Sequence, residues 1–176
     1  AVWVAVTGGL HLDGAVDAFD ALLLAAPPER RLAILKDVHV GAYGIVGAVL
    51  LLLVKWLAIA EAPWPALLAA SVLGRLALVY VIYAFPYARP GGMGSAFKEA
   101  LSTRQLIVAV ATALAAVLAM GTWRGAVVAG VAWLAAWAVG AWAARRLGGG
   151  ITGDIYGLAC EVVEVVALLA WGALYA

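Results

Sequence analysis

The chain has 176 residues, of which 67% are hydrophobic and only 12% are charged, and its net charge is +1. Soluble domains are nearer to half apolar and a quarter charged, so this composition excludes an ordinary soluble domain. The single cysteine also excludes an internal disulfide framework and any metal site built from several cysteines. The surplus apolar surface needs lipid as its solvent. The sequence therefore predicts one integral membrane domain over residues 1–176.

The first six residues are apolar and contain neither an initiator methionine nor the basic segment of a signal peptide. We interpret them as the end of a partial helix and expect further residues to precede position 1. Thr7, Gly8 and Gly9 follow, and they predict a break in that helix. The backbone N–H groups freed by the break would be available to a substrate, although close helix packing explains the glycines equally well.

Three carboxylates follow the break: Asp13, Asp17 and Asp20 stand at positions i, i+4 and i+7, on one face of an α-helix. Like charges this close repel one another unless a cation lies between them. Mg²⁺ suits that role, because it binds carboxylate oxygens and keeps water and substrate phosphate as further ligands. The alternative is a solvated acidic face, but no basic residue lies between positions 13 and 20. His11 is a candidate general base or ligand, or a hydrogen-bonded structural residue.

The first long apolar stretch covers residues 40–60 and follows Lys36 and Asp37. Lys36 suits a contact with a phosphate, or it is an ordinary basic flank of the stretch, and Asp37 is a candidate substrate contact. Lys55 lies inside the stretch, near enough to its end for the side chain to extend to the second membrane face. The next stretch, residues 65–85, contains Arg75, which needs an anionic partner inside a membrane. A carboxylate of another helix or a substrate phosphate would serve.

A loop rich in proline and glycine follows, over residues 86–94, and its composition forbids a regular helix. Together with the residues after it, this segment carries Arg89, Lys98 and Arg104. Such a basic segment could close over a nucleotide phosphate, and the alternative is a positively charged loop that only sets the membrane topology. Two further apolar stretches, residues 105–120 and 125–144, come next.

The last apolar stretch, residues 155–175, begins just after Asp154 and contains Glu161 and Glu164. Asp154 suits the helix N-terminus, where an acid is favoured. The three acids share one helix face, and glutamates within a membrane helix are costly and usually functional. We expect them to complete the metal site or to pair with Arg75.

The five stretches approach the roughly 20 residues that a helix needs to cross a bilayer. They predict an all-α, polytopic bundle of about five transmembrane helices plus the partial N-terminal helix. One side of the membrane then holds eight basic residues, in the segments 7–39, 88–104 and 145–154. The other side holds the short turns near 61–64 and 121–124 and only one basic residue, Arg124. The excess of positive charge indicates that the first side is cytoplasmic. We expect a multi-pass protein of the cell inner membrane with its active site on the cytoplasmic face.

Acids for a cation, bases for phosphates and glycine-rich breaks thus gather on one membrane face, a pattern typical of phosphoryl-type transfer. The candidate catalytic residues are Asp17, Asp20, His11 and Lys36. The candidate metal ligands are Asp13, Asp17, Asp20, Asp154, Glu161 and Glu164. The candidate substrate-binding residues are Thr7, Gly8, Gly9, Asp37, Arg75, Arg89, Lys98 and Arg104.

These motifs resemble, in the same order along the whole chain, those of the cobalamin synthase family, the adenosylcobinamide-GDP ribazoletransferases. The resemblance is carried by Thr7-Gly8-Gly9-Leu10-His11-Leu12-Asp13-Gly14 with Asp17 and Asp20, Lys36-Asp37 with Gly41-Ala42-Tyr43-Gly44, Pro86-Tyr87-Ala88-Arg89-Pro90, and Gly150-Ile151-Thr152-Gly153-Asp154 with Glu161 and Glu164. Residues 15, 16, 18 and 19 depart from the family's small and polar pattern. The family's further hydrophobic N-terminal portion is missing here, which supports the expectation of preceding residues; if that portion lines the site, this chain alone would be inactive.

The resemblance implies a magnesium-dependent transferase that joins adenosylcobinamide-GDP to α-ribazole or its 5′-phosphate and releases GMP. It also implies that Asp13, Asp17 and Asp20 hold Mg²⁺ against the pyrophosphate. The acidic spacing is similar to that of CDP-alcohol phosphotransferases, whose fuller signature is absent, so a phospholipid synthase of that kind is the second enzyme hypothesis. A metal or ion transporter is the third, but it would carry acids near the bilayer centre and on both sides. We expect membrane lipid around the chain, no nucleic-acid partner, and surfaces rich in glycine and alanine that allow a homodimer.

Overall fold

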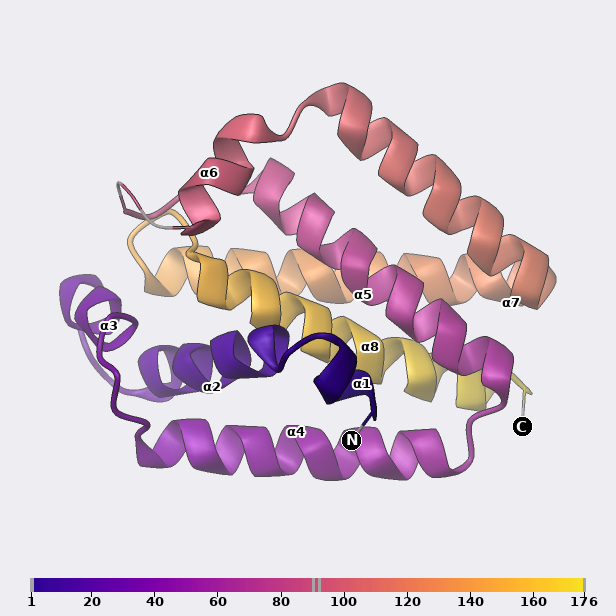
Figure 1. Cartoon of the computed structure of the whole chain (residues 1–176), viewed down its shortest axis with the longest axis horizontal. Coiled ribbons are helices and arrows are strands. Elements are labelled where there is room, and N and C mark those ends of the chain that lie inside the picture. The colour runs from indigo at the N-terminus through magenta and orange to yellow at the C-terminus, as the bar shows by residue number, and fades with distance from the viewer. Residues whose placement is uncertain (1, 90, 92, 176) are drawn as a thin grey trace.

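The computed structural model describes residues 2–89, 91 and 93–175, and within them it is helical apart from turns, loops and one isolated bridge between Tyr87 and Ile151. The expected all-α class is therefore confirmed. The helices are α1 (Val2–Val6), α2 (Leu10–Leu23), α3 (Pro28–Ile34), α4 (Ala42–Ala60), α5 (Trp64–Ala84), α6 (Met93–Ala100), α7 (Thr103–Arg146) and α8 (Gly153–Tyr175). Figure 1 shows them as a bundle, with α3, α6 and the α7–α8 turn at one end and the α4–α5 turn at the other.

Five helical segments are long and apolar enough to cross a membrane, as the sequence predicts: α4, α5, the two arms of α7 and α8. The arms of α7 cover Thr103–Gly121 and Trp123–Arg146, and the helical run reverses direction between them (Figure 1). The chain thus turns near residues 121–124, where the sequence predicts a short turn, although these residues are themselves helical. Gly125 permits the reversal: a Cβ there would lie 2.5 Å from the carbonyl oxygen of Val117.

Helix α8 is the centre of the bundle and contacts α2, α4, α5 and α7. Two glycines let α2 approach it closely. A Cβ on Gly14 would lie 3.1 Å from the Cα of Asp154, and one on Gly157 would lie 2.6 Å from the carbonyl oxygen of His11. Small residues allow helix backbones to meet in this way. The contact sets the acidic face of α2 beside the first turn of α8.

The break between α1 and α2 lies where the sequence predicts it. Gly8 and Gly9 have φ angles of 61° and 72°, in the left-handed region that glycine adopts without strain. The Thr7 hydroxyl donates back to the carbonyls of Trp3 and Val4, at 3.3 and 3.1 Å, and so closes the last turn of α1. Helix α2 then begins at Leu10.

The end of the bundle that holds α3 is fixed by Arg31, whose side chain is only 3% exposed. Its guanidinium donates to the carbonyls of Ala21, Leu22 and Ala26, the first two at the C-terminus of α2. A cation is favourable there, because it satisfies carbonyls that have no partner in the helix. Arg31 thereby determines how the chain turns from α2 into α3.

Two loops that are distant in sequence join at the same end. Ala88 donates its backbone N–H to Ile151, and Ile151 donates to Pro86, both at 2.9 Å. The loop carrying Arg89 is thereby held against the turn that leads into Asp154. Pro90 and Gly92 of the expected proline- and glycine-rich loop lie outside the described residues.

Candidate functional site

Four aspartates form what we call the acidic cluster: Asp13, Asp17 and Asp20 on α2, and Asp154 in the first turn of α8. The close contact between Gly14 and Asp154 brings the two helices together there. Asp13 is exposed, Asp17 and Asp154 are half-buried, and Asp20 is buried. Within the described chain, no ion pair joins any of the four to a cation. The cluster therefore concentrates negative charge at the α3 and α6 end of the bundle.

Asp20 has a structural partner that the sequence did not reveal. Its carboxylate oxygens accept the backbone N–H groups of Gly41 and Gly44, at 2.7 and 2.8 Å. These groups belong to the N-terminus of α4, where unpaired N–H groups and the helix dipole favour a carboxylate. A Cβ on Gly44 would lie 2.3 Å from Asp20 Oδ2, so glycine is needed for the contact. The assignment of Asp20 as a catalytic and metal-binding residue stays a prediction, and its visible contacts anchor α4 to α2.

Asp17 shows the electrostatic character of the cluster. Burial, followed by the negative charges of Asp13, Asp154 and Asp20, raises the pKa of Asp17 from 3.8 to about 6. No hydrogen bond to the carboxylates of Asp13 or Asp17 is found within the described part of the chain. Their oxygens are thus available to a cation, which would relieve the repulsion between the acids.

The carboxylates of the acidic cluster fit a magnesium ion that is held partly by substrate. They fit less well a cation that is held by protein side chains alone. Among the described residues, no three His, Cys, Asp or Glu side chains are placed to hold a metal together. Mg²⁺ commonly takes only one or two carboxylates and fills its remaining positions with water and phosphate oxygens. Asp13 and Asp17, adjacent on one face of α2, match that requirement.

A second group of charges lies deeper, and we call it the ion-pair network: Lys55 on α4, Arg75 on α5, and Glu161 and Glu164 on α8. Lys55 donates to Glu161 at 2.7 Å and also to Glu164, and Arg75 donates to Glu164. Lys55, Glu161 and Glu164 are 5%, 4% and 0% exposed. Lys55 therefore does not extend to the second membrane face, as its place in the sequence allowed, because two carboxylates hold it inside the bundle. The sequence analysis expected Glu161 and Glu164 either to complete the metal site or to pair with Arg75. The structure shows pairing, of Glu164 with Arg75 and of both glutamates with Lys55.

His11 belongs with the ion-pair network and not with the aspartates that follow it in sequence. Its Nδ1 lies 3.7 Å from the Cys160 sulfur on α8. Burial lowers the pKa of His11, and the charge of Arg75 lowers it further, whereas Glu161 and Glu164 oppose the shift. The charges that act on it belong to the ion-pair network. The structure thus separates His11 from the carboxylates with which the sequence analysis grouped it.

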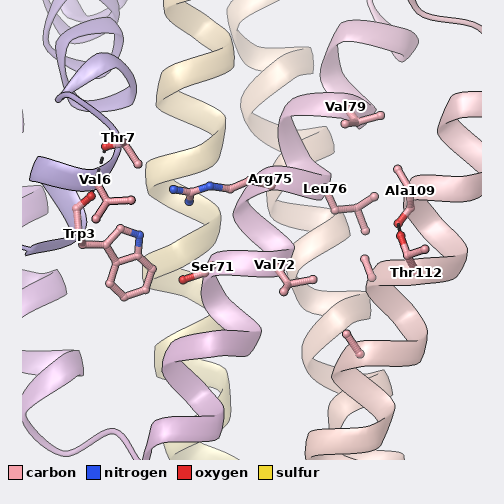
Figure 2. A pocket seen from close by; sticks show the side chains of 12 residues that line it. Trp3, Val6, Thr7, Ser71, Val72, Arg75, Leu76, Val79, Ala109 and Thr112 are labelled. Carbon is pink, nitrogen blue, oxygen red and sulfur yellow. Dashed lines mark hydrogen bonds between the residues drawn. The ribbon is translucent and has the colours of Figure 1, made fainter.

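The predicted substrate contacts Thr7 and Arg75 line a common cavity of about 790 Å³ between α1, α5 and the first arm of α7. Figure 2 shows the Arg75 guanidinium on the α1 side of this cavity, near Trp3 and Thr7, and Thr112 on the opposite wall. Most of the lining is apolar. Gly8 and Gly9 lie in the turn beside it and not in its wall.

The other predicted phosphate contacts are dispersed. Lys36 is exposed after α3, and Arg89 reaches the Leu35 carbonyl at 3.5 Å, so these two share one region. Lys98 donates to the Tyr83 carbonyl at 2.7 Å and thus caps α5, while Arg104 is exposed in the first turn of α7. Asp37 is exposed and accepts two hydrogen bonds from His39, which lower the pKa of Asp37.

The sequence analysis did not predict the contacts of Trp3. Its Nε1 donates to Glu164 at 3.1 Å, and Lys55 Nζ lies 4.9 Å from the centre of its ring. Nothing in six apolar residues predicts this. The pairing of Lys55 had an available signal, since two cations and two acids inside the apolar stretches can neutralise one another.

Comparison with known proteins identifies the family of this chain. The sequence profile of a family described as cobalamin-5-phosphate synthase matches residues 1–172. The chain belongs to this family. Three adenosylcobinamide-GDP ribazoletransferases are similar to it: that of Deinococcus radiodurans is 43% identical over 97% of this chain and 62% of its own length, that of a Roseiflexus species is 41% identical over 94% and 63%, and that of Herpetosiphon aurantiacus is 38% identical over 98% and 70%.

Within the cobalamin-5-phosphate synthase family, the chain spans about three fifths of the length of the first two of these relatives. No solved structure matches it. The family match covers α2 with its three aspartates, the α7–α8 turn with Asp154, and both glutamates of α8. The acidic cluster and the ion-pair network are therefore both features of the segment that the family profile describes.

Proposed function

We propose that this chain carries the transferase activity named for its relatives: it joins adenosylcobinamide-GDP to α-ribazole or its 5′-phosphate and releases GMP. The observation that carries the proposal is the acidic cluster, four aspartates without a paired cation at one end of a membrane bundle. Family membership supports this choice of substrates, because the relatives are named adenosylcobinamide-GDP ribazoletransferases. We place the cluster on the cytoplasmic face of the inner membrane, because eight of the nine basic residues outside the membrane spans lie at that end.

In the proposed reaction, a ribazole hydroxyl oxygen forms a bond to the cobinamide-side phosphorus of the pyrophosphate. The bond between that phosphorus and the bridging oxygen breaks, and the oxygen leaves with GMP. The hydroxyl proton passes to solvent at the exposed edge of the cluster. Asp13 and Asp17 would hold Mg²⁺, which when bound neutralises charge on the pyrophosphate oxygens, and the nearby Asp154 would add to the negative charge that attracts the ion. Arg89 and Lys36, at the same end of the bundle, would contact the phosphates.

The decisive experiment is turnover by the full chain in detergent or nanodiscs, with adenosylcobinamide-GDP and α-ribazole and with or without Mg²⁺. We expect GMP release that depends on Mg²⁺ and matches cobalamin formation mole for mole. Comparing kcat/KM for α-ribazole and its 5′-phosphate identifies the acceptor. Folded protein that releases no GMP with either acceptor would contradict the proposal for this chain. A cytidine-nucleotide substrate, tested in parallel, examines the phospholipid-synthase alternative.

A further inference from the structure

The ion-pair network is electrically balanced, unlike the acidic cluster. Two cations, Lys55 and Arg75, face two carboxylates, Glu161 and Glu164, and within the described chain each member contacts a member of opposite charge. A charge inside a membrane bundle is costly unless it is paired, and here the pairing is complete. The network thus has no surplus charge to offer a metal ion or a phosphate.

Trp3 connects this network to α1. Its indole N–H donates to Glu164, and Lys55 lies over its ring. An indole next to an ammonium group is attracted through the ring face. Since α1 ends at Val6 and the Thr7 hydroxyl closes its last turn on Trp3, the position of Trp3 fixes where the Gly8–Gly9 break lies. Helix α2 starts immediately after that break.

The network and the acidic cluster also share α8. Asp154 and Glu164 are ten residues apart, which is about 15 Å along a helix. Between them lie Gly157, against the backbone of His11, and Cys160, against its ring. The register of α2 on α8 is therefore held at its N-terminal end by the network and by the contacts of His11.

We propose that Lys55, Arg75, Glu161, Glu164 and Trp3 are positioning residues, which set the depth of the α1–α2 break and thereby the register of the α2 aspartates against Asp154. The proposal rests on the proposed function for its kinetic consequence, but its structural consequence stands independently. Removing one charged member leaves an unpaired buried charge, which disturbs a bundle far more than removing both members of a pair. Loss of Lys55 together with Glu161 leaves Arg75 and Glu164 as a balanced pair.

Cys160 is a built-in probe of this register, because it is the only cysteine and its sulfur lies between His11 and Arg75. The test compares its alkylation by N-ethylmaleimide in the full chain with that in Glu164→Gln, Lys55→Met, Glu161→Met and the double variant Lys55→Met/Glu161→Met. We expect each single charge variant to react at least about tenfold faster than the parent, through local opening. The double variant should return to within about threefold of the parent rate. Glu61→Gln, at the opposite end, is the matched control, and Cys160→Ala gives the background.

Kinetics distinguish positioning from direct contact with substrate. The single variants should lower kcat for GMP release about tenfold or more with little change in KM, and the double variant should recover most of kcat. Trp3→Phe keeps an aromatic ring but removes the indole N–H donor, so it should give a smaller change in the same direction and remain folded. A double variant no better than the worse single variant, or labelling rates equal in all variants, would overturn the proposal. If the parent itself releases no GMP, the proposed function fails, whereas the labelling rates still decide the positioning role.

Discussion

The acidic cluster and the ion-pair network use the same kinds of side chain in opposite ways. The cluster sets four aspartates together without a paired cation, near the end of the bundle, and burial together with the neighbouring charges raises the pKa of Asp17 to about 6. The network sets two glutamates against Lys55 and Arg75, deep in the bundle, where an unpaired charge would be far more costly. Within the described residues, carboxylates without a paired cation thus gather only near the end of the bundle, where water or a bound cation can offset their repulsion.

The comparison teaches how to separate functional from structural acids in one membrane domain. Asp13 and Asp17 have oxygens without hydrogen-bond partners in the described chain, and Asp17 has a raised pKa, as expected of a group that awaits a cation. Glu161 and Glu164 are each paired with a cation. Asp20 lies between the two cases, since it belongs to the cluster but its oxygens are bound by the N-terminus of α4. Substitutions at these positions should therefore differ in kind as well as in size.

The largest effect should follow Asp17→Asn, measured as Mg²⁺-dependent GMP release. Removing one carboxylate of a two-carboxylate magnesium site loses several kcal/mol of charge stabilisation, so we expect turnover to fall by about 100- to 1,000-fold. The protein should remain folded, because Asp17 makes no structural hydrogen bond in the described chain. Glu61→Gln makes the same chemical change at the opposite end and should leave turnover unchanged. A fully active Asp17→Asn protein would exclude the metal role of this residue.

Asp20→Ala should instead reduce stability. It removes two hydrogen bonds from backbone N–H groups to a carboxylate, and bonds of this type contribute about 1.5–3 kcal/mol each before relaxation. We expect the free energy of unfolding to fall by about 2–3 kcal/mol, seen as a lower Tm in detergent. Asp17→Ala is the matched comparison and should not lower Tm. Equal losses of stability from the two variants would remove the distinction between a cation-binding and an anchoring aspartate.

Gly44→Ala tests the same contact from α4 and should have a smaller effect. Its Cβ would displace the Asp20 carboxylate, and overpacking of this kind costs about 1–3 kcal/mol, part of which the better helix propensity of alanine offsets. Gly130→Ala is the control, because no atom lies within 4 Å of its added Cβ. It should leave Tm unchanged or raise it slightly. A Gly44→Ala protein as stable as the control would show that Asp20 does not hold α4.

Much of this fold could be predicted from the sequence, because its strongest determinants are local. The membrane stretches follow from apolar length, and the α1–α2 break follows from Gly8 and Gly9. The acidic face of α2 follows from the spacing of its aspartates, and the need of Arg75 for an anion follows from the cost of a buried charge.

What the sequence analysis missed depends on contacts between distant elements. The balance of two cations and two acids inside the apolar stretches was a signal that Lys55 is paired, but nothing local identifies its partner Glu161, 106 positions away. The capping of α4 by Asp20 and the contacts of Trp3 and Arg31 are of the same kind. His11 was grouped with the aspartates because of its place in the chain, although its ring faces Cys160. The metal ligands and a homodimer stay predictions, because the chain alone tests neither.

The smallest effect is a dependence of stability on pH, and its sign separates the cluster from ordinary surface acids. Because the pKa of Asp17 is about 6 when folded and near 3.8 when unfolded, the folded protein binds the extra proton between these values. Its free energy of unfolding therefore falls as pH rises through that window. Without divalent cations, Asp17→Asn should raise Tm by a few degrees at pH about 7.5 and hardly at all at pH about 4. Asp37 behaves in the opposite way, because hydrogen bonds from His39 lower its pKa and its ionised form therefore stabilises the folded protein. Asp37→Asn should accordingly lower Tm at pH about 7.5. Added Mg²⁺ should abolish the advantage of Asp17→Asn, because the parent then gains the cation that its carboxylates lack. An advantage of equal size at both pH values would mean that repulsion within the cluster does not act on Asp17.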